Sequence, residues 1–342
     1  MNPLLTSIFT LTCAFLALPS LAQTNPASAQ NNNASSLQNG FSNQSNTPAA
    51  STNTNPSTIQ NSTASQGGEK ASALPLGPIE ERANKGDAHY QFELGYMYFK
   101  GEGVTKNYTQ SVQWYEKSAA QGFVHALNNL GYMYLMGLGV DKDYKKAFEN
   151  FEKASTKGFP EAIYNLGYMY QKGWGVEPNA TKARDLFETA ATAGNVSAMF
   201  NLGLCYQFGR GTDKDAKKAK QWYEKAANAG HVLAQRNLGY LYEKGDGIDH
   251  DYDEAMEWYK KAAQKNEPIA QYNVGALYEN GKGTTKNFKN ATTWYQLACD
   301  NKFESACKGL DRVKEKIQKE SEAKKKAEEE KKAKEANKAT AS

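Results

Sequence analysis

Charged side chains are absent from the first 68 of the 342 residues, although Lys and Arg total 41 and Asp and Glu total 37. Residues 311–342 hold 11 basic and 8 acidic side chains, which leaves 30 basic and 29 acidic ones in residues 69–310. A neutral body lacks the basic face that nucleic-acid binding needs, and the net charge of +4 comes mainly from the tail. We therefore expect no nucleic-acid partner.

Cysteine is also scarce, with four residues in the chain, which excludes a small protein built on a disulfide framework. The motifs H-E-x-x-H, C-x-x-C and G-x-S-x-G are missing, and no P-loop Lys-Ser/Thr follows any of the Gly-x-Gly pairs. The histidines form no cluster with metal-ligand spacing. We expect no metal, no cofactor and no enzymatic activity. The four histidines are His89, His125, His231 and His250.

Residues 1–22 are apolar from about Leu4 to Leu18 and end in Pro19 and a small-x-small triplet, Ser20–Ala22. This run is too short for a comfortable membrane span, which needs about 20 apolar residues. It predicts a cleaved signal peptide and an exported protein, periplasmic or secreted, without an integral membrane span in the mature chain. Because no Lys or Arg precedes the apolar run, an uncleaved anchor is an alternative, and lipidation at Cys13 is a weaker one.

The regions on either side of the body are poor in apolar residues. Residues 23–75 are rich in Asn, Ser, Thr and Gln, and this composition predicts a disordered tether because it buries too little apolar surface to offset its ordering entropy. Residues 311–342 alternate Lys and Glu with Ala and contain i, i+4 pairs such as Glu328 and Lys332. We expect a charged tail that is helical or disordered. It lacks the apolar seam of a coiled coil, and attachment to an anionic surface is a weaker alternative.

The body of the chain repeats with a period of 36 residues. Each period contains one glycine that we call the ladder glycine, and a Gly-x-Gly pair follows it at a constant distance. A fixed period of this length predicts stacked supersecondary units that bury their apolar faces against one another. The ladder glycines are Gly95, Gly131, Gly167, Gly203, Gly239 and Gly275.

Each period is predicted to form two helices. The first carries Ala126, Leu130 and Tyr134 on one side in the second copy, and the second carries an alanine and aromatic stripe. Gly-x-Gly supplies residues that accept positive φ and ends the first helix. The ladder glycine lies inside that helix, where it costs about 1 kcal/mol relative to Ala. We expect it to allow close approach of another helix, covered by the tyrosine three residues later.

These residues carry a family resemblance. The pattern A-x-x-x-L-G-x-x-Y-x-x-G-x-G-V, followed by A-x-x-W-Y-x-K-A-A-x-x-G, resembles the Sel-1-like repeat, a relative of the tetratricopeptide repeat; Leu130–Tyr134, Gly137–Val140 and Trp222–Ala227 carry the likeness. The resemblance implies an all-α fold, a right-handed α-solenoid of six 36-residue helix-turn-helix repeats over 80–310. It also implies a capping helix from about Ser305, first helices that line the concave surface, and protein–protein interaction.

The spacing of two cysteines points to the cysteine-rich secreted branch of this family. The spacing A-C-x(7)-C at Cys299 and Cys307 resembles that branch, which implies a disulfide between them; two buried thiols are the alternative. Cys205 stands where other copies have Met and is expected to be an inert buried thiol. The same branch implies an alternative function, a β-lactam- or peptidoglycan-directed hydrolase or binding protein. S-x-x-K together with its partner motifs is not found, however.

The side of the first helix opposite Ala126, Leu130 and Tyr134 is rich in Tyr, Asn, Arg and Lys, which suits binding of an extended peptide. Packing between copies, with Asn bridging neighbouring helices, is the alternative.

We expect an exported scaffold that binds a peptide or protein partner on the concave face, in envelope signalling, wall-enzyme control or host contact; a structural envelope tether is a further alternative. The predicted partner-binding residues are Tyr96, Asn129, Tyr132, Asn165, Tyr168, Asn201, Arg236, Asn237, Tyr240 and Asn273.

Overall fold

The computed structural model describes residues 76–339, in which every regular element is an α-helix, so the all-α fold is confirmed there. The predicted signal peptide (1–22) and tether (23–75) lie outside these residues. The helices are α2 (Leu76–Asn84), α3 (Ala88–Lys100), α4 (Tyr108–Ala120), α5 (Val124–Met136), α6 (Tyr144–Ser155), α7 (Pro160–Lys172), α8 (Ala180–Thr192), α9 (Val196–Phe208), α10 (Ala216–Asn228), α11 (Val232–Lys244), α12 (Tyr252–Ala263), α13 (Pro268–Asn280), α14 (Phe288–Asp300) and α15 (Glu304–Ala339).

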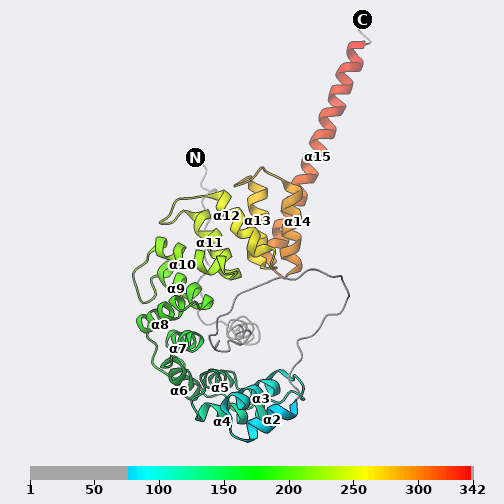
Figure 1. Ribbon diagram of the computed structural model, residues 1–342. Helices are drawn as coiled ribbons and strands as arrows, with labels where there is room; N and C mark the ends of the chain where they lie inside the picture. The colour runs from blue at the N-terminus through cyan, green and yellow to red at the C-terminus, as the bar shows by residue number, and fades with distance from the viewer. Residues whose placement is uncertain (1–75, 340–342) are drawn as a thin grey trace, which may run out of the picture. The chain divides into compact units, whose positions relative to one another are not determined.

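Each helix packs against the helix before it and the helix after it, which confirms the predicted solenoid. The first repeat is formed by α3 and α4, and the sixth by α13 and α14. Figure 1 shows the first helices α3, α5, α7, α9 and α11 along the inner side of the curve that the repeats follow, with the second helices outside them. We call the exposed side of the first helices the inner face.

Polar caps and glycines set the same helix bounds in each repeat. Every second helix follows an Asn or Asp whose side chain accepts a backbone N–H of the first turn; Asp143, for example, accepts from Lys146 at 3.0 Å. Every first helix ends at a glycine with positive φ, such as Gly137 at 70°, whose N–H donates to the Met133 carbonyl. The two helices of a repeat are therefore specified by local sequence.

From repeat two onward, the second glycine of each turn has a different role, because it contacts the preceding repeat. A Cβ at Gly139 would overlap the backbone of Tyr108 and Thr109 at the start of α4. A Cβ at Gly175 would overlap the Tyr144 carbonyl at the start of α6. The glycine thus docks each turn on the previous second helix, and a side chain there would push neighbouring repeats apart.

The ladder glycine accepts an aromatic ring of the second helix. A Cβ at Gly203 would lie 2.5 Å from Cε1 of Tyr223, and one at Gly167 would lie 2.9 Å from Cε1 of Phe187. Both rings are fully buried. The predicted close helix approach is confirmed, but the tyrosine three residues later is not the covering ring, so that part of the prediction is wrong. The tyrosine at that position reaches the previous second helix instead, as when Tyr134 donates to Glu116 at 3.0 Å.

Helices outside the six repeats cover both ends of the described array. At the start, α2 packs on α3 and buries Ile79 and Ala83, a helix that the sequence pattern does not predict. At the other end, the predicted disulfide joins Cys299 of α14 to Cys307 of α15, with Cα atoms 4.8 Å apart. Cys205 is a buried free thiol, as expected, and burial raises its pKa to about 11.

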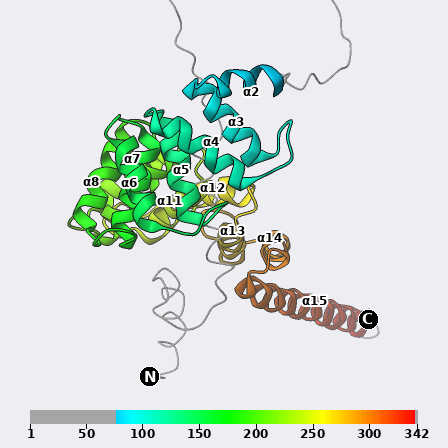
Figure 2. The ribbon, with the colours of Figure 1, turned by 90° about the horizontal axis from the view of Figure 1, so that it is seen from below.

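The predicted cap and charged tail form one continuous helix, α15. Ala306, Leu310 and Val313 are buried against the last repeat, whereas the described side chains from Lys314 onward are exposed. A helix of 36 residues is about 54 Å long at 1.5 Å per residue. Figures 1 and 2 both show α15 extending away from α13 and α14.

A buried carboxylate attaches α15 to the sixth repeat. Glu279 of α13 is 4% exposed and accepts hydrogen bonds from Arg312 Nε (3.0 Å), Arg312 Nη2 (2.7 Å) and Lys316 Nζ (2.8 Å). The Tyr295 hydroxyl donates to it as well, at 2.7 Å. Burial raises the pKa of Glu279, but these hydrogen bonds outweigh it and lower the pKa to about 2.

We predict that Gly167→Ala lowers the free energy of unfolding. Overpacking against Phe187 costs about 1–3 kcal/mol, which exceeds the gain in helix propensity of at most about 1 kcal/mol. Urea denaturation measures the difference. Gly77→Ala is the matched control, because a Cβ at this helical glycine would meet no atom within 4 Å. A Gly167→Ala protein as stable as the wild type, or more stable, would show that the ring does not need the glycine.

Acid should loosen the attachment of α15. The folded pKa of Glu279 lies below its ordinary value of 4.5, so its contribution is complete above about pH 4.5 and is lost as the pH falls toward 2. Arg312 and Lys316 are about half exposed, so solvent screens part of the attraction, and we expect Glu279→Gln to lower the free energy of unfolding by about 1–3 kcal/mol at pH 7. In a plot of this free energy against pH, the acid limb, which is the fall below about pH 4.5, should be shallower for the variant than for the wild type. Glu304→Gln, which breaks the exposed pair with Lys308, is the control and should leave the profile unchanged. An unaltered acid limb in Glu279→Gln would contradict this attachment.

Candidate functional site

Most of the predicted partner-binding residues are buried between repeats. Six of the ten have exposed fractions of 9% or less. Tyr96, Tyr240 and Asn273 remain partly exposed, and the side chain of Arg236 is 16% exposed. The accessible part of the inner face is therefore smaller than the sequence pattern suggests. The six buried residues are Asn129, Tyr132, Asn165, Tyr168, Asn201 and Asn237.

The buried asparagines connect neighbouring repeats, and their partners depend on the ring of the preceding second helix. Where that ring is a tyrosine, its hydroxyl accepts from the next asparagine: Asn129 donates to Tyr115 at 3.1 Å and Asn237 to Tyr223 at 3.3 Å. After a phenylalanine, the amide reaches the preceding first helix, as when Asn165 donates to Asn128 at 2.9 Å. These bonds favour the packing alternative for the amides.

Asn201 and Arg236 also connect repeats. Asn201 donates to the Tyr164 hydroxyl of the previous first helix at 3.4 Å. Arg236 Nη1 lies 3.1 Å from Oε1 of Glu267, the residue that caps α13, and so links repeats five and six. None of these contacts tests partner binding, which stays a prediction. They show that several of the selected side chains already have structural partners.

The residues one and five positions after each ladder glycine form a row along the inner face that we call the inner row; Tyr132 and Tyr168 in it are buried, and the others are partly or fully exposed. In repeats one, three and five, it pairs a tyrosine with a lysine whose Nζ lies over the ring: 5.7 Å for Lys100 and Tyr96, 5.4 Å for Lys172 and Tyr168, and 5.6 Å for Lys244 and Tyr240. The full row is Tyr96, Lys100, Tyr132, Met136, Tyr168, Lys172, Leu204, Phe208, Tyr240, Lys244, Ala276 and Asn280.

Even-numbered repeats contribute mainly apolar side chains to the inner row. Met136 and Phe208 occupy the lysine position there and are partly exposed. The row thus alternates cation-bearing aromatic pairs with apolar groups, a surface suited to an extended segment with apolar and acidic side chains. The sequence reveals this alternation when odd-numbered copies are compared with even-numbered ones, because the inner-row lysines recur every 72 residues rather than every 36.

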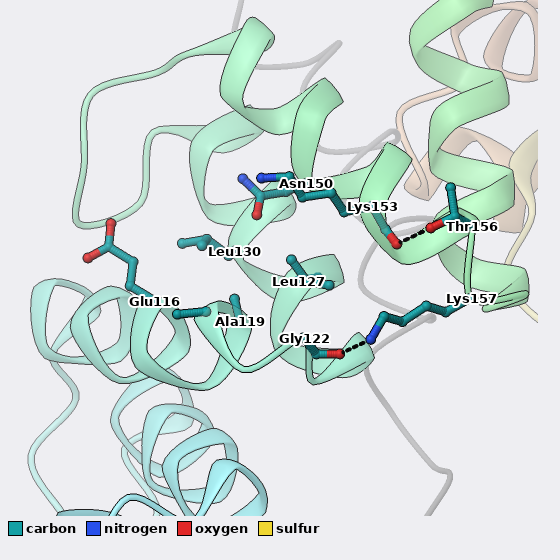
Figure 3. A pocket seen from close by; sticks show the side chains of 10 residues that line it. Glu116, Ala119, Gly122, Leu127, Leu130, Asn150, Lys153, Thr156 and Lys157 are labelled. Carbon is teal, nitrogen blue, oxygen red and sulfur yellow. Dashed lines mark hydrogen bonds between the residues drawn. The ribbon is translucent and has the colours of Figure 1, made fainter.

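A hollow with a volume of about 460 Å³ lies between α4 and α6, the second helices of repeats one and two (Figure 3). Leu127 and Leu130 of α5 line it together with Glu116. Lys157 Nζ donates to the Gly122 carbonyl at 2.6 Å across this hollow, so the cation joins the two repeats. The lining contains no His, Cys or Ser. Within residues 76–339, no group of three or more His, Cys, Asp or Glu side chains is placed to hold a metal ion.

Comparison with protein families matches six consecutive segments of the chain to the Sel1 repeat. The chain belongs to the Sel1 repeat family. Sel1 repeat proteins are generally non-catalytic scaffolds for protein–protein interaction, and protein partners are the kind that this fold suggests. The matched segments are residues 88–123, 124–159, 160–195, 196–231, 232–267 and 268–303.

Two solved Sel1 repeat structures are similar to this chain. One is c5321, a protective antigen of uropathogenic Escherichia coli strains, at 33% identity over 70% of this chain with a TM-score of 0.68. The match covers 52% of that protein, so this Sel1 repeat chain spans about half its length. The other is a Sel1 repeat protein from Oxalobacter formigenes, at 34% identity over 63% of this chain and 86% of that one, with a TM-score of 0.58. Comparison with curated proteins finds no match.

Proposed function

We propose that this Sel1 repeat protein is an exported scaffold that binds an extended segment of a protein or peptide partner along its inner row. The observation that carries the proposal is the row itself. Tyrosine–lysine pairs recur every second repeat on the first helices, and all of their side chains except the buried Tyr168 are partly or fully exposed, although much of the rest of the face is used for packing. Recurrent contacts at a fixed spacing suit an extended partner that passes from repeat to repeat.

The place of action that we propose is the cell envelope or the medium. The support is the apolar run and cleavage pattern of residues 1–22, together with the disulfide between Cys299 and Cys307, a bond typical of oxidising compartments. Within residues 76–339, no helix combines the length and apolarity of a membrane span. Envelope signalling, control of wall enzymes and host contact are the roles that such a scaffold would serve.

The burial of Tyr132 and Tyr168 decides where a probe of binding belongs. Truncation of either side chain would leave a cavity and weaken the fold, so loss of a partner would have two explanations. Tyr96 and Tyr240 are better positions, because both are partly exposed and lie on the inner row.

A photoreactive residue at position 240 should cross-link a partner in the native organism, and the adduct should appear in the envelope or secreted fraction. The same probe at Gln221, exposed on the outer helix α10, is the matched control and should give no such adduct. Tyr96→Ala combined with Tyr240→Ala should reduce capture under conditions where circular dichroism shows the variant folded; because Tyr96 stacks on Phe92 and Tyr240 packs on a core cluster, we expect a cost of about 1–3 kcal/mol in the free energy of unfolding. Adducts from position 221 alone, or capture that the double variant leaves intact, would contradict binding at the inner row.

A further inference from the structure

The middle of the inner face holds two cations that have no acidic partner in the described part of the chain. Lys172 is the last residue of α7, and Arg210 lies between the two glycines of the turn after α9. Both are partly buried, and neither forms an ion pair with a carboxylate of residues 76–339. Even Glu177 and Asp213, the acidic residues of the two nearby turns, are not paired with them.

The equivalent lysines of repeats one and five have a different setting. Lys100 is followed in its turn by Glu102, and Lys244 by Asp246. The residue at that position in repeat three is Trp174. Repeats three and four therefore lack the acidic residue that follows Lys100 and Lys244 two positions later in the chain, and their cations are partly buried whereas Lys100 and Lys244 are exposed.

Burial and the neighbouring Arg210 lower the pKa of the Lys172 amine. Two like charges that are close enough to disturb one another, and that are partly removed from water, oppose folding unless an anion compensates them. No carboxylate of residues 76–339 forms an ion pair with either cation, so an anionic group of a partner would meet two uncompensated positive charges there.

Each of the two cations lies beside an aromatic ring. Lys172 Nζ lies over the Tyr168 ring at 5.4 Å, and Arg210 Cζ lies 5.2 Å from the Phe208 ring centroid. Trp174 contacts Tyr168 edge-on, with ring centroids 5.6 Å apart. An anionic group here would lie beside apolar surface, where its attraction to the cations is screened less than in open water.

We infer that the partner of the inner row presents a carboxylate to Lys172 and Arg210, flanked by apolar side chains that pack on the partly exposed Trp174 and Phe208. This inference rests on the proposed function and specifies the chemistry of the partner: an extended, acidic and partly apolar segment of another protein. The chain's own residues 1–68 do not fit this site, because they contain no charged side chain.

The test uses the full chain and two synthetic probes. The first is an amidated nine-residue peptide of alternating Glu and Leu with a rhodamine label, and the second has Gln in place of each Glu. Fluorescence anisotropy should show binding of the Glu peptide that weakens with salt, and binding of the Gln peptide weaker by about tenfold or more, because a charge-assisted hydrogen bond contributes roughly 1.5–3 kcal/mol.

Variants locate the site. Lys172→Ala combined with Arg210→Ala should weaken binding of the Glu peptide by about tenfold or more, whereas the matched pair Lys100→Ala and Lys244→Ala should change it less than about threefold. The melting temperature of Lys172→Ala should stay the same or rise, because a repulsion is removed. A purely structural role for the two cations would lower it.

Four results would overturn the inference: equal binding of the Gln peptide, equal loss in the two double variants, competition by inorganic phosphate at the concentration of the Glu peptide, or concentration-dependent dimers that Lys172→Ala with Arg210→Ala abolishes. The last would show that a second copy of this chain occupies the site.

The cross-linking experiment at position 240 tests the proposed scaffold function independently. If position 240 still cross-links a partner, these four results contradict only the carboxylate inference; if it does not, the proposed scaffold function is contradicted as well.

Discussion

A buried aromatic ring that rests on a glycine of the neighbouring helix sets the distance between the two helices of each repeat. Six rings do this, four tyrosines and two phenylalanines, and all are fully buried. The glycine lowers helix propensity by about 1 kcal/mol, and the packing that it permits outweighs that cost. A second glycine then seats each turn on the previous repeat. Because both contacts recur every 36 residues, equivalent side chains on the inner face recur at the same interval.

This packing determines which part of the inner face can meet a partner. The asparagines beside the ladder glycine bond to the rings' hydroxyls or to the previous first helix, so their amides hold repeats together. The inner row is displaced from these bonds toward the turns, where tyrosine–lysine pairs and apolar groups alternate. Its central cations, Lys172 and Arg210, are partly buried, whereas the outer lysines, Lys100 and Lys244, are exposed. The residues that stabilise the array and the exposed residues that we propose for binding thus lie on the same helices.

Local features of the sequence predict local features of the structure well. The turn glycines and the two helices per period follow from short-range patterns, and the Cys299–Cys307 bond follows from the family resemblance of the cysteine spacing. The prediction of the ring that packs on the ladder glycine was wrong. For Gly203 the choice lies between Tyr206 and Tyr223, and it depends on the register between two helices. Asn129 and Asn165 have the same position and type, yet bond differently because Tyr115 and Phe151 differ in another helix. Helix α2 lies before the first matched repeat, and no periodic partner marks it.

A double-mutant cycle between Gly203 and Tyr223, measured by urea denaturation, tests the central contact most directly. In the wild type, Gly203→Ala should lower the free energy of unfolding by about 1–3 kcal/mol, because the new Cβ would lie 2.5 Å from Cε1 of the Tyr223 ring. In a Tyr223→Ala background the obstruction is gone, so the same change should raise it by up to about 1 kcal/mol through helix propensity. Equal destabilisation in both backgrounds would show that the glycine serves some purpose other than admitting the ring.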